Sequence, residues 1–113
     1  MNWILLEQYE QLEIIKSRSI TKPQVIFKHS TTCGISSMIK NRLERTLDLP
    51  EADYYYLDLL THRSLSDGVA HTFGVEHESP QILLIQGGKC VYTESHYGIM
   101  GDEIAANMLP ISK

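Results

Sequence analysis

The segment TTCGIS, residues 31–36, carries a cysteine, Cys33, followed three positions later by Ser36. A thiolate attacks disulfides, and a dithiol oxidoreductase needs a second cysteine at that later position to close an intramolecular bond. A serine hydroxyl cannot perform this redox step, so the Cys-x-x-Ser spacing predicts a monothiol cycle. From this spacing alone two interpretations of Cys33 stay open, a reactive nucleophile and a buried thiol that fills space, and Ser36 is compatible with either.

Cys33 lies where a strand-like pattern gives way to a helical one. Residues 23–29, PQVIFKH, are typical of a buried strand, and apolar side chains then recur every four positions from Ile35 to Leu47. The thiol is therefore expected at a helix N-terminus, where unpaired backbone N–H groups and the helix dipole stabilise a thiolate. Three neighbours are expected to assist it: Thr32 as the helix N-cap, and Lys28 or His29 as a source of positive potential.

A second candidate feature is the segment HESPQILLI, residues 77–85, in which Ser79 and Pro80 precede a predicted strand. Proline at the start of a strand costs no ladder hydrogen bond, so Pro80 can simply mark where the strand begins. The alternative is a cis Ser79–Pro80 peptide facing Cys33, with the Ser79 backbone free to pair with an extended substrate. His96 is expected at the same end of the sheet, as a ligand for the anionic parts of a small thiol or as a surface residue.

Short elements of alternating type surround these features and must position them. Their order is β-α-β-α-β-α-β-β-α, with two parallel crossovers followed by a hairpin. We therefore predict an α/β, thioredoxin-like fold with a central mixed sheet flanked by helices, in one domain spanning residues 1–113. The remaining predicted elements are a strand at 3–6, a helix with an apolar face at 9–15, a strand from 53, a helix at 63–73 ended by Gly74, a hairpin at 81–95 turning at 87–88, and a last helix capped by Asp102.

The composition is that of a soluble globular chain, since 42% of the 113 residues are apolar and 21% are charged. The formal net charge is -4, and the ten basic residues form no concentrated face for a phosphate backbone, so a nucleic-acid partner is not expected. No apolar run reaches the roughly 20 residues of a membrane span, and no secretion signal is visible at the N-terminus. These patterns predict a cytoplasmic protein without a membrane partner.

The second cysteine, Cys90, closely follows the predicted hairpin turn. About five residues of strand separate it from the end of the sheet that holds Cys33, a distance on the order of 15 Å, which is far beyond disulfide reach. We expect both thiols to be free and Cys90 to be structural. The cysteines and histidines lack the Cys-x-x-Cys and His-x-x-x-His spacings of closed metal sites, so neither a metal ion nor a tightly bound cofactor is expected.

Three segments taken in order, KHSTTCGIS, HESPQ and SHYGI, resemble the monothiol bacilliredoxins, the YtxJ-type proteins of the bacillithiol system, over nearly the whole chain. The resemblance implies reduction of mixed disulfides between bacillithiol and cytosolic proteins, with Cys33 as the nucleophile and bacillithiol as a low-molecular-weight thiol co-substrate. Proline more often follows the cysteine in that family, where this chain has Gly34. The residues expected to contact the substrate around Cys33 are Thr32, Gly34, Ser36, Ser79, Pro80 and His96.

Two other functions stay open from the sequence. The TCGIS segment also resembles the Cys-Gly-Phe-Ser site of monothiol glutaredoxins, which share the thioredoxin-like fold and can carry an iron–sulfur cluster between two chains. Ile35 departs from the phenylalanine of that site, and the Gly-Gly-x-x-Asp pattern of those proteins is only partly matched at residues 98–103. A redox-inactive adaptor on the same fold would instead have an unreactive Cys33 that forms no adduct.

Overall fold

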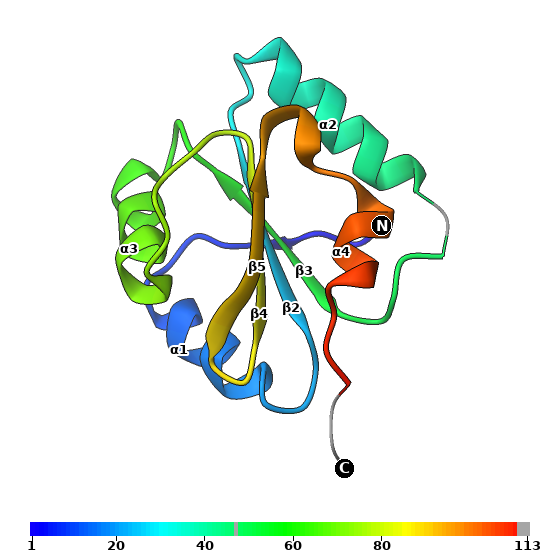
Figure 1. The fold of residues 1–113 in the computed structure, drawn as a ribbon. Coiled ribbons are helices and arrows are strands. Elements are labelled where there is room, and N and C mark those ends of the chain that lie inside the picture. The colour runs from blue at the N-terminus through cyan, green and yellow to red at the C-terminus, as the bar shows by residue number, and fades with distance from the viewer. Residues whose placement is uncertain (47, 111–113) are drawn as a thin grey trace.

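A five-stranded sheet with helices on both faces forms the centre of the molecule (Figure 1). The computed structural model describes residues 1–46 and 48–110. The predicted order of strands and helices is confirmed, with a short 3-10 helix, η1, added before the last α-helix. Along the chain the elements are β1 (Ile4–Leu5), α1 (Glu10–Arg18), β2 (Gln24–His29), α2 (Gly34–Arg45), β3 (Asp53–Asp58), α3 (Arg63–Phe73), β4 (Gln81–Gln86), β5 (Lys89–Ser95), η1 (His96–Gly98) and α4 (Gly101–Ala106).

The sheet has the strand order β1-β3-β2-β4-β5. Strands β1, β3 and β2 run parallel, whereas β4 pairs antiparallel with both β2 and β5. The hairpin between β4 and β5 turns at Gly87 and Gly88, whose φ angles of 64° and 79° fit the primed turn expected of a glycine pair. At the other end of the sheet, β2 and β3 finish together, and the N–H of Leu59 donates to the carbonyl of His29 at 2.8 Å.

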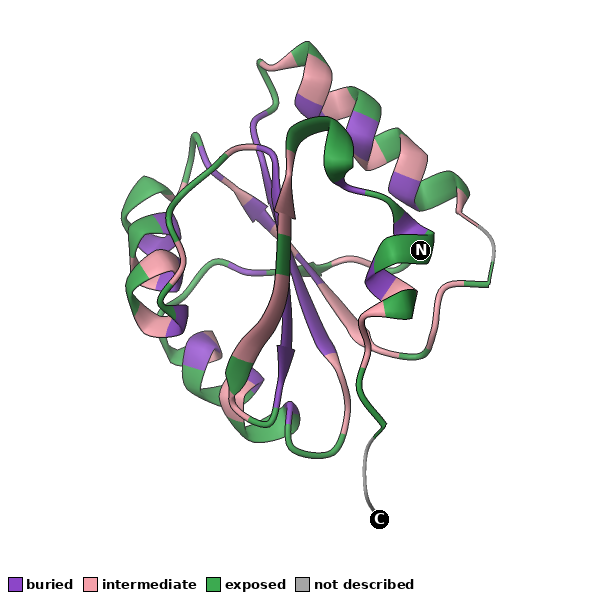
Figure 2. Cartoon of the chain, viewed as in Figure 1, coloured by how far each residue is buried: buried purple, intermediate pink, exposed green. Residues whose placement is uncertain are grey.

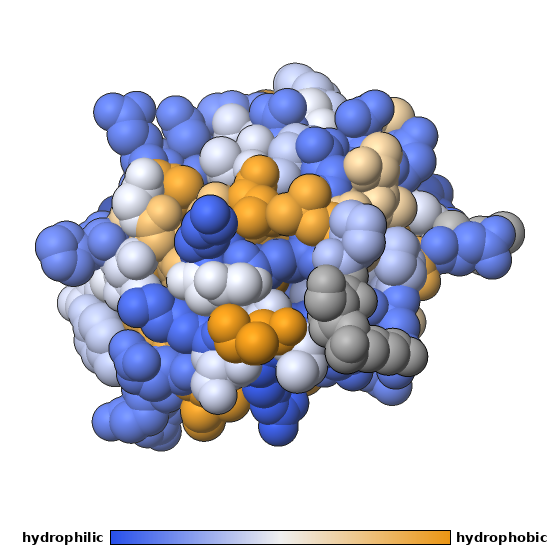
Figure 3. Space-filling model, turned by 60° about the horizontal axis from the view of Figure 1, so that its bottom comes forward, coloured by the Kyte–Doolittle hydropathy of each residue, from blue (hydrophilic) through white to orange (hydrophobic). Residues whose placement is uncertain are grey.

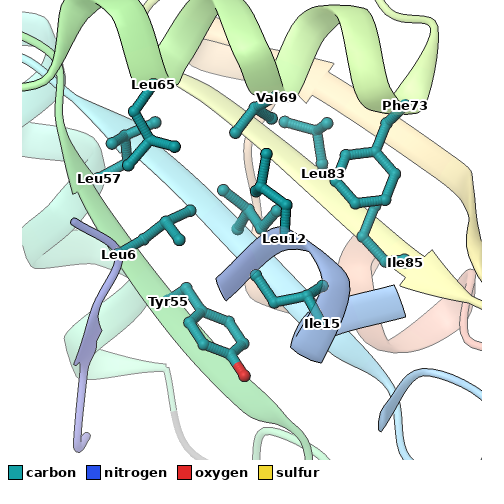
Figure 4. Close-up of a cluster of buried hydrophobic side chains, with 11 residues drawn as sticks. Leu6, Leu12, Ile15, Tyr55, Leu57, Leu65, Val69, Phe73, Leu83 and Ile85 are labelled. Atoms are coloured by element: carbon teal, nitrogen blue, oxygen red, sulfur yellow. The ribbon is translucent and has the colours of Figure 1, made fainter. Parts of the chain in front are cut away.

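Side-chain alternation divides the core between the two faces of the sheet. Helices α1 and α3 cover one face, which Figure 4 shows in close-up, and α2 and α4 cover the other. Within β2, Ile26 packs under α1 and α3, whereas Val25 and Phe27 pack under α2. Strands β2 and β4 are buried along their whole length (Figure 2). Because each fully buried aliphatic side chain contributes roughly 1.5–3 kcal/mol, this double core fixes the end of β2 that leads to Cys33.

The last helix begins earlier than the sequence predicts. Its N-cap is Met100 and not Asp102, because the backbone is still extended at Met100 and the N–H of Ile104 already donates to the Met100 carbonyl at 3.1 Å. Asp102 lies in the first turn, where its carboxylate interacts favourably with the positive end of the helix dipole. It also accepts the N–H of Glu103 at 3.1 Å.

Two other helix ends bear on the sequence prediction. Helix α2 ends at Arg45, and Leu47, which the four-residue spacing places in this helix, lies outside the described residues. Helix α3 has the predicted bounds, and Gly74 ends it in the left-handed conformation with φ 66°.

In the described part of the chain, no helix combines the length and the apolar character that a membrane crossing requires.

Candidate active site

Three chain segments meet at the end of the sheet that is uppermost in Figure 1. Gln81, the first residue of β4, pairs with Lys28 near the end of β2 and with Ser95 at the end of β5. This pairing brings the turn that carries Cys33, the peptide before Gln81 and the residue His96 to the same end of the sheet. They form a candidate active site around a single thiol.

Cys33 is the N-cap residue of α2 and is half-buried. Its backbone is extended, with φ −101° and ψ 117°, and its N–H donates to the carbonyl of Ser30 at 3.1 Å. The N–H of Ser37 donates to the Cys33 carbonyl at 3.1 Å, so the N–H groups of residues 34–36 lie ahead of the first helical hydrogen bond. These groups and the dipole of the 12-residue helix favour negative charge at its N-terminus, as thiolate chemistry requires.

The three sequence neighbours of Cys33 that were expected to contact substrate differ in exposure. Thr32 is exposed, but it is not the N-cap: the chain becomes helical one residue later, and the Thr32 hydroxyl lies 3.3 Å from that of Ser30. Gly34 is exposed, with no atom within 4 Å of the place that a Cβ would occupy. Ser36 is fully buried, which argues against the substrate contact expected of it. Thr32 and Gly34 are therefore open to a ligand, and Ser36 is not.

The hydroxyl of Ser36 is engaged inside the protein. It accepts the N–H of Ser30 at 3.1 Å and lies 2.6 Å from Nδ1 of His29. The sequence analysis missed this contact, although one signal was available: strand alternation places His29 on the same face of β2 as Val25 and Phe27, toward α2. The residue of α2 that it meets could not be read from that pattern.

The environment of His29 keeps its ring neutral. The residue is 4% exposed and packs between Phe27 and Tyr56, whose ring centroids lie 5.7 and 5.4 Å away. Burial lowers the pKa of His29 below 6.5, Lys40 acts in the same direction, and Asp58 opposes them. At pH 7 His29 therefore does not supply the positive potential that the sequence analysis expected of it.

Lys28 lies on the opposite face of the sheet from α2. Its side chain is fully buried, and Nζ donates to the carbonyl of Ser66 at 3.1 Å and lies 3.3 Å from Nδ1 of His77. Burial lowers the pKa of Lys28 from 10.5 to about 8, and Asp67 acts in the opposite direction. Lys28 therefore belongs to the α3 side of the sheet, not to the surroundings of the Cys33 thiol.

The peptide between Ser79 and Pro80 is cis, as the second of the two sequence interpretations of this proline requires, whereas pairing of Ser79 with a substrate stays a prediction. The Pro80 carbonyl accepts the N–H of His96 at 3.0 Å, and the side-chain amide of Gln81 holds the preceding loop by donating to the Glu76 carbonyl at 2.8 Å. Within residues 1–46 and 48–110, the N–H and C=O groups of Ser79 make no hydrogen bond. The backbone of Ser79 is thus left for an external partner, whereas Pro80 itself is buried.

His96 begins the 3-10 helix after β5 and is exposed, with a positive φ of 55°. Its Nε2 lies 3.8 Å from a carboxylate oxygen of Glu78. Arg42 ties this segment to α2, because its Nη1 donates to the carbonyls of Tyr97 and Ile99, both at 3.0 Å. The sequence analysis missed Arg42, since no local pattern shows that a helix residue binds a turn 55 positions later.

Cys90 lies at the other end of the sheet and on its other face. It pairs with Ile85, four positions along β4 from Gln81, which at the rise of a strand is about 13 Å. Its side chain packs against the core under α1 and α3, whereas Cys33 caps α2. Both cysteines are free, and burial raises the pKa of the Cys90 thiol. This position supports the structural role expected of Cys90.

Two hollows of the surface lie away from Cys33. One, of about 480 Å³, lies between the segment before α1 and the loop before α3, residues 7–10 and 60–65. The other, of about 380 Å³, lies beside the hairpin turn and is lined in part by Ile20, Val91 and Leu109. Figure 3 shows the molecule with its bottom turned forward, and on this face apolar areas are separated by hydrophilic ones. Neither hollow includes the candidate active site.

Known proteins resemble this chain in sequence and in structure. The family model described as monothiol bacilliredoxin matches residues 4–104. A solved structure described as a candidate oxidoreductase with a thioredoxin fold is 32% identical, with a TM-score of 0.80 over 92% of this chain and 91% of that chain. A thioredoxin from Schistosoma mansoni is 19% identical, with a TM-score of 0.72 over 96% of this chain and 100% of its own. A thioredoxin from Fasciola hepatica is also 19% identical, with a TM-score of 0.71 over 92% and 98%. The predicted fold class is confirmed.

Proposed function

The chain belongs to the monothiol bacilliredoxin family and is a thiol oxidoreductase of that kind, and we propose that it reduces mixed disulfides between bacillithiol and cytosolic proteins through Cys33. The Cys33 thiolate attacks the bacillithiol sulfur, the mixed disulfide breaks, and the protein leaves as a thiolate that takes up a proton. Cys33 then holds bacillithiol in a new disulfide. A second bacillithiol thiolate attacks this adduct, so that bacillithiol disulfide leaves and the Cys33 thiolate is restored.

The observation that carries the proposal is the position of Cys33 at the N-cap of α2, half-buried and remote from Cys90. The helix N-terminus stabilises the attacking thiolate, and the partial exposure of Cys33 admits a substrate sulfur. Because the serine at position 36 cannot attack the adduct, a small thiol has to release it. The cycle thus needs bacillithiol as co-substrate and no bound cofactor.

The surroundings of Cys33 suit the two parts of such a substrate. The N–H and C=O groups of Ser79, which have no hydrogen-bond partner among the described residues, can pair with an extended segment of the protein substrate, in the way that a strand adds to a sheet. Gly34 at the helix N-terminus and His96 after β5 are both exposed at this end of the sheet, where they can accept the anionic parts of bacillithiol. Thr32 is exposed beside them.

Intact-mass measurement of the reduced protein after exposure to bacillithiol disulfide tests this proposal, with glutathione disulfide as a separate comparison. We expect one bacillithiol adduct on the wild type and on the Cys90→Ser variant, and none on Cys33→Ser. Free bacillithiol should then release the adduct. A protein substrate that carries bacillithiol should lose it to the wild type and keep it with Cys33→Ser. An adduct that persists in Cys33→Ser, or a Cys33–Cys90 bond in the wild type, would contradict the proposal.

A further inference from the structure

We propose that Ser36 and His29 are positioning residues that hold Cys33 at the N-terminus of α2 through a hydrogen-bonded clamp closed on Ser30. The inference rests on the proposed role of Cys33 as the nucleophile, and it assigns to Ser36 a function other than substrate contact. Within the described ranges, the Cys33 side chain makes no hydrogen bond that would hold it at the helix cap. The position of the thiol therefore depends on the backbone of the turn that carries it.

Ser30 is held from both sides of this turn. Its carbonyl accepts the N–H of Cys33 at 3.1 Å, and its N–H donates to the hydroxyl of Ser36 at 3.1 Å, one helical turn beyond Cys33. One residue at the end of β2 thus binds both the N-cap and the first turn of α2. If the Ser36 hydroxyl were removed, the N–H of Ser30 would remain buried without a partner, and the turn would lose one of its two attachments.

His29 fixes the orientation of the Ser36 hydroxyl. The Ser36 oxygen accepts from Ser30, and among the residues that the structure describes the only acceptor within reach of its proton is Nδ1 of His29, at 2.6 Å. The hydroxyl therefore donates to a neutral imidazole. Because Phe27 and Tyr56 pack around the ring, the imidazole has little freedom to turn away. The clamp is thus anchored in the rigid core of the sheet.

This arrangement gives a second reason for serine at position 36. The first reason is that serine cannot act as a second thiol. A cysteine there would offer a weak S–H donor and a weak sulfur acceptor in place of the two hydrogen bonds of the hydroxyl. An alanine would offer neither. Serine is short enough to fit the fully buried site and both donates and accepts, as the clamp requires.

The test compares the rate constant for alkylation of Cys33 by iodoacetamide in four chains, all carrying Cys90→Ser. They are the parent, Ser36→Ala, His29→Phe and the double variant. Phenylalanine suits the aromatic surroundings of His29, so this variant removes the acceptor while keeping the packing. Urea unfolding of each chain shows that the rates are measured on folded protein. The matched control is Ser37→Ala, because Ser37 is half-buried in the same helical turn and its side chain makes no hydrogen bond in the described part of the chain.

Iodoacetamide reacts with the thiolate, and a Cys33 that is no longer held at the helix N-terminus loses the backbone N–H groups and the helix dipole that stabilise this anion. We therefore expect up to about a tenfold loss of rate in Ser36→Ala and in His29→Phe. The double variant should be no slower than either single variant, because the two residues act through one clamp. Ser37→Ala should stay within about twofold of the parent.

Three results would overturn the clamp. The first is a Ser36→Ala rate equal to that of the parent in folded protein, which would make Ser36 purely structural. The second is a double variant slowed by the product of the two single effects, which would make the residues independent. The third is a parent that is not alkylated at Cys33, which would also refute the proposed function, whereas the first two results leave that function intact.

Discussion

Lys28 brings a positive charge into the interior beneath α3, and replacing it with methionine should change how stability depends on pH. Its side chain is fully buried, and the ammonium group is bound to the carbonyl of Ser66 and contacts His77. Burial lowers the pKa of Lys28 from 10.5 to about 8 in the folded protein. In the unfolded chain the side chain is hydrated and its pKa returns to the ordinary value.

The sign of the effect follows from which state binds the proton. Between about pH 8 and 10.5 the unfolded chain keeps the Lys28 proton that the folded protein has released, so stability rises with pH across this window. Below pH 8 both states bind the proton, and the folded protein bears the cost of the buried charge. Integrating between pH 7 and pH 10 with these two pKa values gives a gain of about 2.5 kcal/mol for the chain that contains Lys28.

Urea unfolding of the wild type and of Lys28→Met at both pH values measures this gain. The single tryptophan, Trp3, stacks on Phe27 at 5.6 Å and supplies the fluorescence signal. The other ionisable groups are the same in both chains, so their contributions cancel when the two free energies of unfolding are subtracted. The free energy of unfolding of the wild type minus that of Lys28→Met should rise by about 2.5 kcal/mol from pH 7 to pH 10. A difference that stays constant within about 0.5 kcal/mol would refute the reasoning.

Two further substitutions test how the site is built. Gly34→Pro should raise the free energy of unfolding by about 0.5–1 kcal/mol, because the first helical position accepts proline, the Cβ position is open and Cys33 is already extended. A lower urea midpoint would contradict this. Arg42→Met should cost about 1–2 kcal/mol and speed hydrogen exchange around η1, because it removes both bonds to the carbonyls of Tyr97 and Ile99. Unchanged exchange would show that η1 is held by packing alone.

Local patterns in the sequence predict those parts of the fold that short-range geometry decides. The bounds of α3 follow from its four-residue apolar spacing and from Gly74, and the β4–β5 turn follows from the glycine pair at 87–88. The start of α2 is predicted to within one residue. The exact N-cap is not predicted, because the Thr32 hydroxyl bonds with Ser30 instead of with the helix, and that choice depends on the shape of the turn.

The supporting contacts of the site cannot be read from the sequence, because they join residues whose distance depends on the assembled sheet. Strand alternation tells that Lys28 and His29 face opposite sides, but not that one meets α3 and the other meets Ser36. The polar pattern likewise gives no sign that Arg42 binds the segment after β5. Such long-range contacts depend on the assembled sheet, whereas the Cys-x-x-Ser spacing on which the proposed thiol chemistry rests is local in the sequence.

The placement of the two cysteines explains why, in the proposed cycle, release of the adduct is intermolecular. Cys33 caps a helix on one face of the sheet, and Cys90 packs under α1 and α3 on the other face, near the opposite end. Because the sheet core lies between them, no loop movement brings the two sulfur atoms within disulfide distance while the fold persists. In the proposed cycle a second thiol therefore enters from solvent. Gly34, which directly follows Cys33, is exposed, so an incoming thiol can approach Cys33 along this side of the helix N-terminus.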